Sequence, residues 1–136
     1  MIKAILLDAG GVLYLNNDGM GHVNMPLLEF IKMNQERYIF GIISTTDYNL
    51  NDILEKYGID ALFKIVLTSG ETGLEKNEVH IYKKALLSIN LEPEEVIFID
   101  NEEQYLEAAA FLGIRTILYN GDFDLCRREI EQIILQ

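Results

Sequence analysis

Four side chains of this 136-residue chain have types that could together move a phosphoryl group: Asp8, Ser44, Lys76 and Asp100. A carboxylate can attack phosphorus, while a hydroxyl and an ammonium hold the phosphate oxygens. A second carboxylate can help to hold Mg²⁺, which prefers oxygen ligands and keeps several waters. The combination is far more specific than any single member, since Asp8 alone could simply cap a turn.

Short apolar runs precede these residues, and we interpret the runs as strands. Runs of this length are typical of strands buried on both faces of a parallel sheet. In an open α/β sheet, ligands bind just beyond the carboxyl ends of the strands. Asp8, Ser44 and Asp100 should therefore meet at one edge of the sheet, with Lys76 in a loop on the same side. The predicted strands are 2–7, 38–44, 65–68, 96–99 and 115–119.

Helical patterns alternate with the strands, which predicts βαβ units. The expected fold is α/β: a three-layer, doubly wound parallel sheet of about five strands in one domain, residues 1–136. A tight turn is expected over 14–19, and the glycine-broken stretch 69–76 is expected to be an irregular loop. The predicted helices are 26–36, one opened by Asn49 or Asn51 and ended by Gly58, 78–89, 105–112, and one over 125–135 opened by Asp122 or Asp124.

Composition and charge narrow the classes of function. Lys and Arg number 11 against 22 Asp and Glu, a net charge of −11, which argues against binding to nucleic acid or to an anionic membrane. A phosphorylated ligand would need a metal or a local lysine to offset that charge. The chain leads from Met1 straight into a strand without a signal peptide, so we expect a cytoplasmic protein with no membrane helix. The single cysteine, Cys126, is expected to be a structural thiol.

The chain resembles the haloacid dehalogenase-like (HAD) superfamily from Ile2 to Tyr119, with four motifs in order. Ile-Leu-Leu-Asp8-Ala-Gly-Gly-Val-Leu is similar to the nucleophile motif, and Gly-Ile-Ile-Ser44-Thr45 to the phosphate-binding motif. The stretch Thr-Ser-Gly-Glu-Thr-Gly-Leu-Glu-Lys76 resembles the loop that carries the family's lysine. Val-Ile-Phe-Ile-Asp100 resembles the metal-binding motif.

The resemblance implies a role for each matched residue and Mg²⁺ as the cofactor. Asp8 would be the nucleophile and a metal ligand, and Lys76 would neutralise charge between Asp8 and the phosphoryl group. The other implied roles are the metal-ligating backbone carbonyl of Gly10, the metal-ligating carboxylate of Asp100, and phosphoryl binding by Ser44 and Thr45.

This chain also departs from the family pattern. Phosphatases of the family carry a second Asp, the general acid and base, where this chain has Gly10. Losing such a group costs about 10²–10⁴-fold in rate. Asp18 and Asp47 are candidates to replace it. Milder departures are Asn101 for an Asp, Tyr105 for an Asn and Asn77 for a Pro.

No stretch of the chain has room for a cap domain. The site should then be open to solvent or covered by another copy in a homo-oligomer. By analogy, an open site suits a large substrate, such as a phosphorylated protein or glycan, more than a small metabolite. We therefore expect a Mg²⁺-dependent phosphomonoester phosphatase that works through an aspartyl phosphate, with reduced efficiency. Whether it is an enzyme stays open at this point. The alternative is a catalytically weak module that binds a phosphorylated ligand or a protein partner, and a phospho-accepting receiver domain fits less well because such domains place an acidic pair after the first strand.

Overall fold

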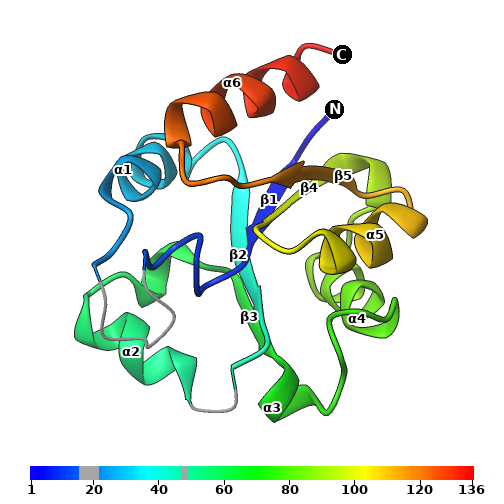
Figure 1. Ribbon diagram of the computed structural model, residues 1–136, viewed down its shortest axis with the longest axis horizontal. Helices are drawn as coiled ribbons and strands as arrows, with labels where there is room; N and C mark the ends of the chain where they lie inside the picture. Colours follow the sequence, from blue (N-terminus) through cyan, green and yellow to red (C-terminus); the bar gives the residue numbers. More distant parts are fainter. Residues whose placement is uncertain (16–21, 47–48) are drawn as a thin grey trace.

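Five parallel strands form one sheet in the computed structural model, which describes residues 1–15, 22–46 and 49–136 (Figure 1). The order of strands across the sheet is β3-β2-β1-β4-β5. The fold class and the number of strands predicted from the sequence are confirmed. The strands are β1 (Ala4–Leu7), β2 (Ile39–Ser44), β3 (Ile65–Thr68), β4 (Val96–Asp100) and β5 (Arg115–Leu118).

β1 lies at the centre of the sheet, between β2 and β4. The chain builds outward from β1 on one side through β2 and β3, and then crosses to the other side at β4. All residues of β1 and β4 are buried, as expected for strands covered on both faces. Open α/β sheets bind ligands at the carboxyl ends of the strands where the strand order changes direction in this way, here next to β1.

Helices cover both faces of the sheet and make three layers (Figure 1). The first face is covered by α1 (Met25–Asn34), α2 (Leu50–Lys56) and α6 (Phe123–Ile134). The second face is covered by α4 (His80–Ile89) and α5 (Glu103–Phe111). A one-turn helix, α3 (Ser69–Thr72), follows β3, and short 3-10 turns lie at Asp60–Leu62 and Pro93–Glu95.

Successive side chains of each strand point to opposite faces of the sheet, and this separates two apolar cores. Ile5 and Leu7 of β1 point to the first face, whereas Ala4 and Leu6 point to the second. The alternation follows from the two-residue period of a strand, so a continuous apolar run supplies both cores. Each helix then needs only one apolar stripe to close its layer.

Several helix boundaries differ from the sequence-based prediction. The stretch 69–76, expected to be irregular, contains α3, whose first turn is capped by the Thr68 hydroxyl accepting from the Glu71 amide at 3.1 Å. α4 begins at His80 rather than at residue 78, while α5 and α6 each begin two residues earlier than expected. Asn49 and Asp122 are the observed N-caps of α2 and α6.

The chain after β1 doubles back on itself before α1. The Leu15 amide donates to the His22 carbonyl at 2.9 Å, and Tyr14 forms an antiparallel bridge with Val23. The predicted turn at 14–19 falls mostly on residues 16–21, which lie outside the described part. Within the described ranges no cap domain is evident, and no helix there is long and apolar enough to cross a membrane.

Candidate active site

Lys76 joins two carboxylates that belong to neighbouring strands. Its Nζ lies 2.9 Å from Oδ1 of Asp8 and 2.6 Å from Oδ2 of Asp100. The side chains of Lys76 and Asp100 are fully buried, and that of Asp8 is 10% exposed. Three of the four residues singled out for phosphoryl chemistry therefore touch one another, although 92 positions separate Asp8 from Asp100 in the sequence.

The ends of β1 and β4 hold the two carboxylates in place. The Asp8 amide continues the parallel pairing by donating to the Ile99 carbonyl at 3.0 Å. Asp100 is the last residue of β4, and its Oδ1 accepts from the Glu102 amide at 3.0 Å. Oδ1 therefore binds the backbone that follows β4, while Oδ2 faces Lys76.

Three aromatic residues surround Lys76, and the sequence pattern gave no indication of these contacts. The Tyr82 hydroxyl lies 2.7 Å from the Lys76 carbonyl oxygen and 3.1 Å from the Tyr105 carbonyl oxygen, so its proton is shared between the lysine loop and α5. The Tyr105 ring centroid is 4.6 Å from Lys76 Nζ, and that of Phe98 is 5.6 Å away. Both distances are within the range of cation–π attraction.

Tyr82 stands in the apolar stripe predicted for its helix, where it looks like an ordinary core residue. Burial, and then the charges of Asp100 and Asp8, raise the pKa of the Tyr82 hydroxyl, so it stays protonated and acts as a donor. The one sign of this donor role in the sequence was the residue type, because a buried tyrosine usually needs a hydrogen-bond partner for its hydroxyl.

The charges of this cluster do not balance. Two carboxylates face one ammonium, which leaves one negative charge without a counter-ion inside the cluster. Burial and the Asp100 charge raise the pKa of Asp8 to about 6 against the opposing effect of Lys76. The raised pKa has the direction expected when a buried carboxylate lacks sufficient positive charge around it.

The donor set fits a hard divalent cation. Among the residues that the structure describes, no group of three or more His, Cys, Asp and Glu is placed to hold a metal. As the family resemblance implies, the carboxylates of Asp8 and Asp100 and the carbonyl of Gly10 would hold the ion, leaving the other positions to water or phosphate. Mg²⁺ is commonly bound in this way, through one or two carboxylates, and keeps the rest of its shell. Its charge would also offset the surplus negative charge of the cluster.

Ser44 lies at the same edge, one strand away from Asp8. It ends β2, is buried, and pairs in register with Thr68 of β3. Its Oγ accepts a hydrogen bond from the Thr46 amide at 3.3 Å, which closes a turn and does not use the hydroxyl hydrogen. Thr45 is exposed beside it. The edge therefore presents a hydroxyl group next to the Asp8, Asp100 and Lys76 cluster.

The loop after β1 passes close to the loop after β4. Gly11 has φ +87°, and an added Cβ there would collide with the Asn101 side chain. Gly10 has no positive φ and no side chain, so the residue at the position of the family's acid–base carboxylate offers no titratable group of its own. Asp18 and Asp47, the candidates to replace it, lie outside the described residues.

Comparison with known proteins gives the context for this site. Residues 27–119 match the family model described as haloacid dehalogenase-like hydrolase. An uncharacterized hydrolase of Schizosaccharomyces pombe is 38% identical over 112 residues, covering 76% of this chain and 47% of that protein. The GMP/IMP nucleotidase of Escherichia coli is 31% identical over 110 residues, covering 79% of this chain and 49% of that protein. The chain thus spans about half the length of these relatives.

A solved structure has the same fold. It is a HAD family enzyme from Bacteroides thetaiotaomicron in complex with magnesium and inorganic phosphate, with a TM-score of 0.76 and 18% identity, covering 90% of this chain and 96% of that one. At that identity the likeness concerns the fold alone, whereas the family model covers most of the chain from α1 to the residue after β5. The chain belongs to the haloacid dehalogenase-like hydrolases.

Proposed function

We propose that this protein is a Mg²⁺-dependent phosphomonoester phosphatase that works through a phosphorylated Asp8. The observation that carries the proposal is the contact of Lys76 with both Asp8 and Asp100 at the carboxyl edge of the sheet. That edge brings two carboxylates and one ammonium into a buried cluster, which supports roles as nucleophile, metal ligand and cation. The relatives that act on phosphate esters, such as the nucleotidase, support the same class of reaction.

In the first step an oxygen of Asp8 attacks phosphorus, and the ester P–O bond breaks as the new P–O bond to Asp8 forms. Lys76 is 2.9 Å from Asp8 and stabilises the charge on the transferred group. The hydroxyl hydrogen of Ser44 and the exposed Thr45 donate to its oxygens. Mg²⁺, when bound to Asp8, Asp100 and the Gly10 carbonyl, would reduce the repulsion between the carboxylate and the phosphate.

In the second step water attacks the phosphorus of phospho-Asp8, and phosphate leaves as the Asp8 carboxylate is restored. A general acid would protonate the leaving alcohol in the first step, and the same group would deprotonate water in the second. Gly10 has no side chain that could carry out either proton transfer. Unless Asp18 or Asp47 replaces the missing group, solvent delivers and accepts these protons, which favours leaving groups that depart without protonation, such as aryl or acyl phosphates.

The substrate proposed is a phosphorylated small molecule or macromolecule that reaches an open site in a single core domain. A second copy of the chain could cover this opening in a homo-oligomer. The absence of a cap domain in the described part supports access by large substrates.

Hydrolysis of an aryl phosphate with and without Mg²⁺ tests the mechanism. We expect Asp8→Asn to abolish turnover and removal of Mg²⁺ to do the same. Glu107→Gln, on an exposed position of α5, is the matched control for the loss of one carboxylate and should remain active. Activity that survives Asp8→Asn unchanged would overturn the mechanism.

The second candidate is a catalytically weak module that binds a phosphorylated ligand or a protein partner, and Gly10 is the observation that favours it. Gly10→Asp restores the missing group without a strained backbone, since Gly10 has no positive φ. A rise in turnover toward the factor of about 10²–10⁴ expected of a general acid and base would identify a degraded enzyme. Binding of the phosphate mimic beryllofluoride without turnover in either form would favour the module.

A further inference from the structure

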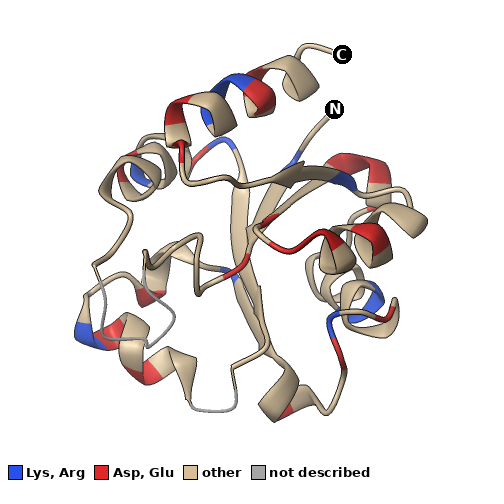
Figure 2. Ribbon diagram, in the orientation of Figure 1, with Lys and Arg blue, Asp and Glu red and all other residues tan. Residues whose placement is uncertain are grey.

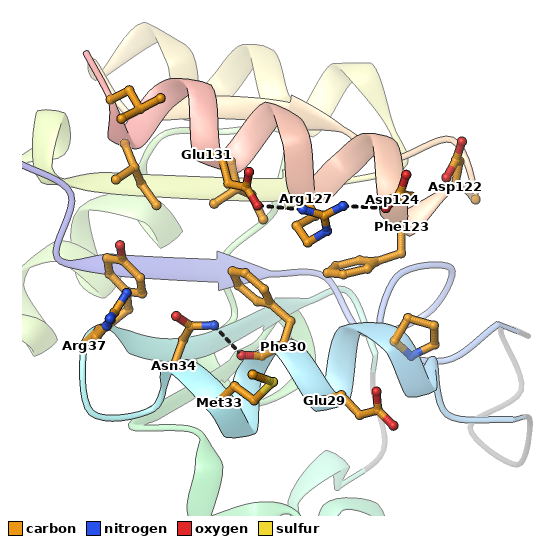
Figure 3. A pocket seen from close by; sticks show the side chains of 16 residues that line it. Glu29, Phe30, Met33, Asn34, Arg37, Asp122, Phe123, Asp124, Arg127 and Glu131 are labelled. Carbon is orange, nitrogen blue, oxygen red and sulfur yellow. Dashed lines mark hydrogen bonds and ion pairs between the residues drawn. The ribbon is translucent and has the colours of Figure 1, made fainter.

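A long groove lies between α1 and α6, and neither the proposed reaction nor the relatives' names account for it (Figure 3). Its volume is about 1090 Å³. The two helices that form its sides both begin at the carboxyl edge of the sheet, because each runs antiparallel to the strands. Its floor holds the side chains of Phe30, Tyr38, Phe123, Ile130 and Ile134.

The floor is apolar and only half closed. The ring centroids of Phe30 and Phe123 are 5.8 Å apart in an edge-on arrangement that bridges the two helices. Both rings are only partly buried, although both pack against the first core. On the rim, Met33 and Leu135 are each 84% exposed. Apolar surface gathered in one groove in this way is typical of a binding site, whereas single exposed apolar residues are ordinary.

The rim is acidic where α1 and α6 begin. Glu29, Asp122 and Asp124 are exposed there (Figure 3). Arg127 contacts Asp124 and Glu131 at 2.6 and 2.7 Å, and Arg128 contacts Asp124 at 3.2 Å, so these charges are paired within α6. Glu29 and Asp122 are the acidic lining residues that remain outside these pairs. Arg37 at the far end of the groove is the other cation among the lining residues. Acidic and basic residues occur on both helices (Figure 2), and the residues that line the groove include four acidic and two basic ones.

We propose that this groove docks an amphipathic helix of a partner protein, with an apolar stripe and flanking Lys or Arg residues. An apolar floor between two helices fits the stripe of a third, the recurrent helix-in-groove mode of recognition. The acidic rim attracts cationic flanks and disfavours acidic ones. A second copy of this chain is the poorer occupant of the groove, since two copies joined through this face would bring the same acidic rim against itself.

The groove also leads toward the candidate active site. Asn24, the N-cap of α1, donates to the Tyr119 hydroxyl at 2.9 Å, which joins the beginning of α1 to the segment between β5 and α6. A helix in the groove would have one end at the edge of the sheet where Asp8 and Asp100 lie. The docking proposal does not depend on the proposed reaction, because it rests on the shape and charge of a separate surface.

A model peptide tests the docking. The probe is a labelled peptide of about 18 residues built from Leu, Lys and Ala, with Leu at positions i, i+3, i+4 and i+7. Two comparison peptides are a shuffled one of equal composition and one with Glu in place of Lys. Fluorescence anisotropy against the whole chain should show saturable binding of the first peptide, and binding at least about tenfold weaker of the other two. Equal binding of the first and shuffled peptides would overturn the proposal.

Matched variants locate the binding. Met33→Glu puts a charge on the rim and should weaken binding at least about tenfold, whereas Leu87→Glu, on α4 at 82% exposure, should not. Glu29→Lys should weaken binding more than Glu107→Lys on the far side of the sheet. Binding left unchanged by Met33→Glu, or weakened equally by Leu87→Glu, would contradict the proposal. If sedimentation shows a dimer and Met33→Glu dissociates it, the occupant of the groove is a second copy of this chain and the partner-helix proposal is wrong.

Discussion

At the scale of single residues, one ammonium serves two buried carboxylates. Lys76 is 1% exposed, so its ammonium is held inside the cluster. It is therefore the counter-ion that permits Asp8 and Asp100 to be buried together, besides any role toward phosphate. Buried charges are tolerated when they are paired, and removing one partner exposes the full cost of burying the other.

Lys76→Met is expected to lower the free energy of unfolding by about 3–5 kcal/mol, because it leaves two buried carboxylates facing each other. Asp8→Asn leaves a balanced pair of Lys76 and Asp100, so we expect a change of no more than about 1 kcal/mol. Urea unfolding of the metal-free variants at neutral pH measures both. Equal losses in the two variants would mean that charge balance does not govern the stability of the cluster.

The buried thiol gives a prediction about pH. Burial, and then the charge of Glu129, raise the pKa of Cys126 from 9.0 to about 12, so the folded state favours the neutral thiol. Stability from this group is fully present below pH 9 and is lost as the pH rises toward 12, by at most about 1.4 kcal/mol per pH unit.

Cys126→Val removes this titration. Between pH 8.5 and 10.5 (roughly the interval above the thiol's ordinary pKa) the wild type should lose more stability than the variant. The measurement is the difference between the two proteins in the slope of the free energy of unfolding against pH, because lysines and tyrosines titrate in both of them. Native Cys126 should also resist a thiol reagent at pH 8 until the chain is unfolded, because both its burial and its thiol state protect it. Rapid native labelling would contradict this.

At the scale of elements, α4 and α5 carry the residues that hold Lys76. Tyr82 of α4 reaches the Lys76 carbonyl, and its ring lies 5.3 Å from that of Phe98 of β4. Tyr105 of α5 brings its ring against the ammonium. The lysine loop thus takes its position from the second helical layer, while the carboxylates take theirs from the strands.

Tyr82→Phe is expected to cost about 1–3 kcal/mol in stability, because the buried Lys76 carbonyl loses its hydroxyl donor, and to lower kcat more than it changes KM. The reason is that Lys76 would be less well fixed between Asp8 and the phosphoryl group. Tyr105→Phe keeps the ring beside Lys76 and is the matched control, expected to remain near wild type. Aryl phosphate hydrolysis and urea unfolding give both readouts. A Tyr82→Phe enzyme with unchanged kcat would contradict the positioning role.

The strands were predictable because a strand buried on both faces is a continuous apolar run, and the short length of such a run identifies it as a strand. The order of the carboxyl ends then placed Asp8, Ser44 and Asp100 at one edge. α3 was missed because a single turn interrupted by Gly70 has no helical period to detect. The contacts of Tyr82 were missed for a different reason: they join residues of separate elements, and a pattern within one helix cannot show which distant carbonyls a hydroxyl will meet.

At the scale of the whole molecule, the net charge of −11 acts on the stability as well as on the choice of partner. Self-repulsion among many acidic groups opposes compactness, and any salt screens it. A divalent cation bound between Asp8 and Asp100 would act differently, because it binds the folded chain at one place. The two effects can be separated by comparing Mg²⁺ with NaCl at equal ionic strength.

We expect Mg²⁺ to raise the melting temperature of the wild type by several degrees beyond the NaCl control, since a ligand at 100 times its Kd adds about 2.7 kcal/mol. Asp100→Asn keeps Lys76 paired with Asp8 and so should fold, but it lacks one metal-binding carboxylate and should lose the extra increase. Glu107→Gln removes one negative charge from the surface and should keep the extra increase in melting temperature. If all three proteins respond to Mg²⁺ alike, the cation acts by screening, and the carboxylate pair at the ends of β1 and β4 is not a metal site.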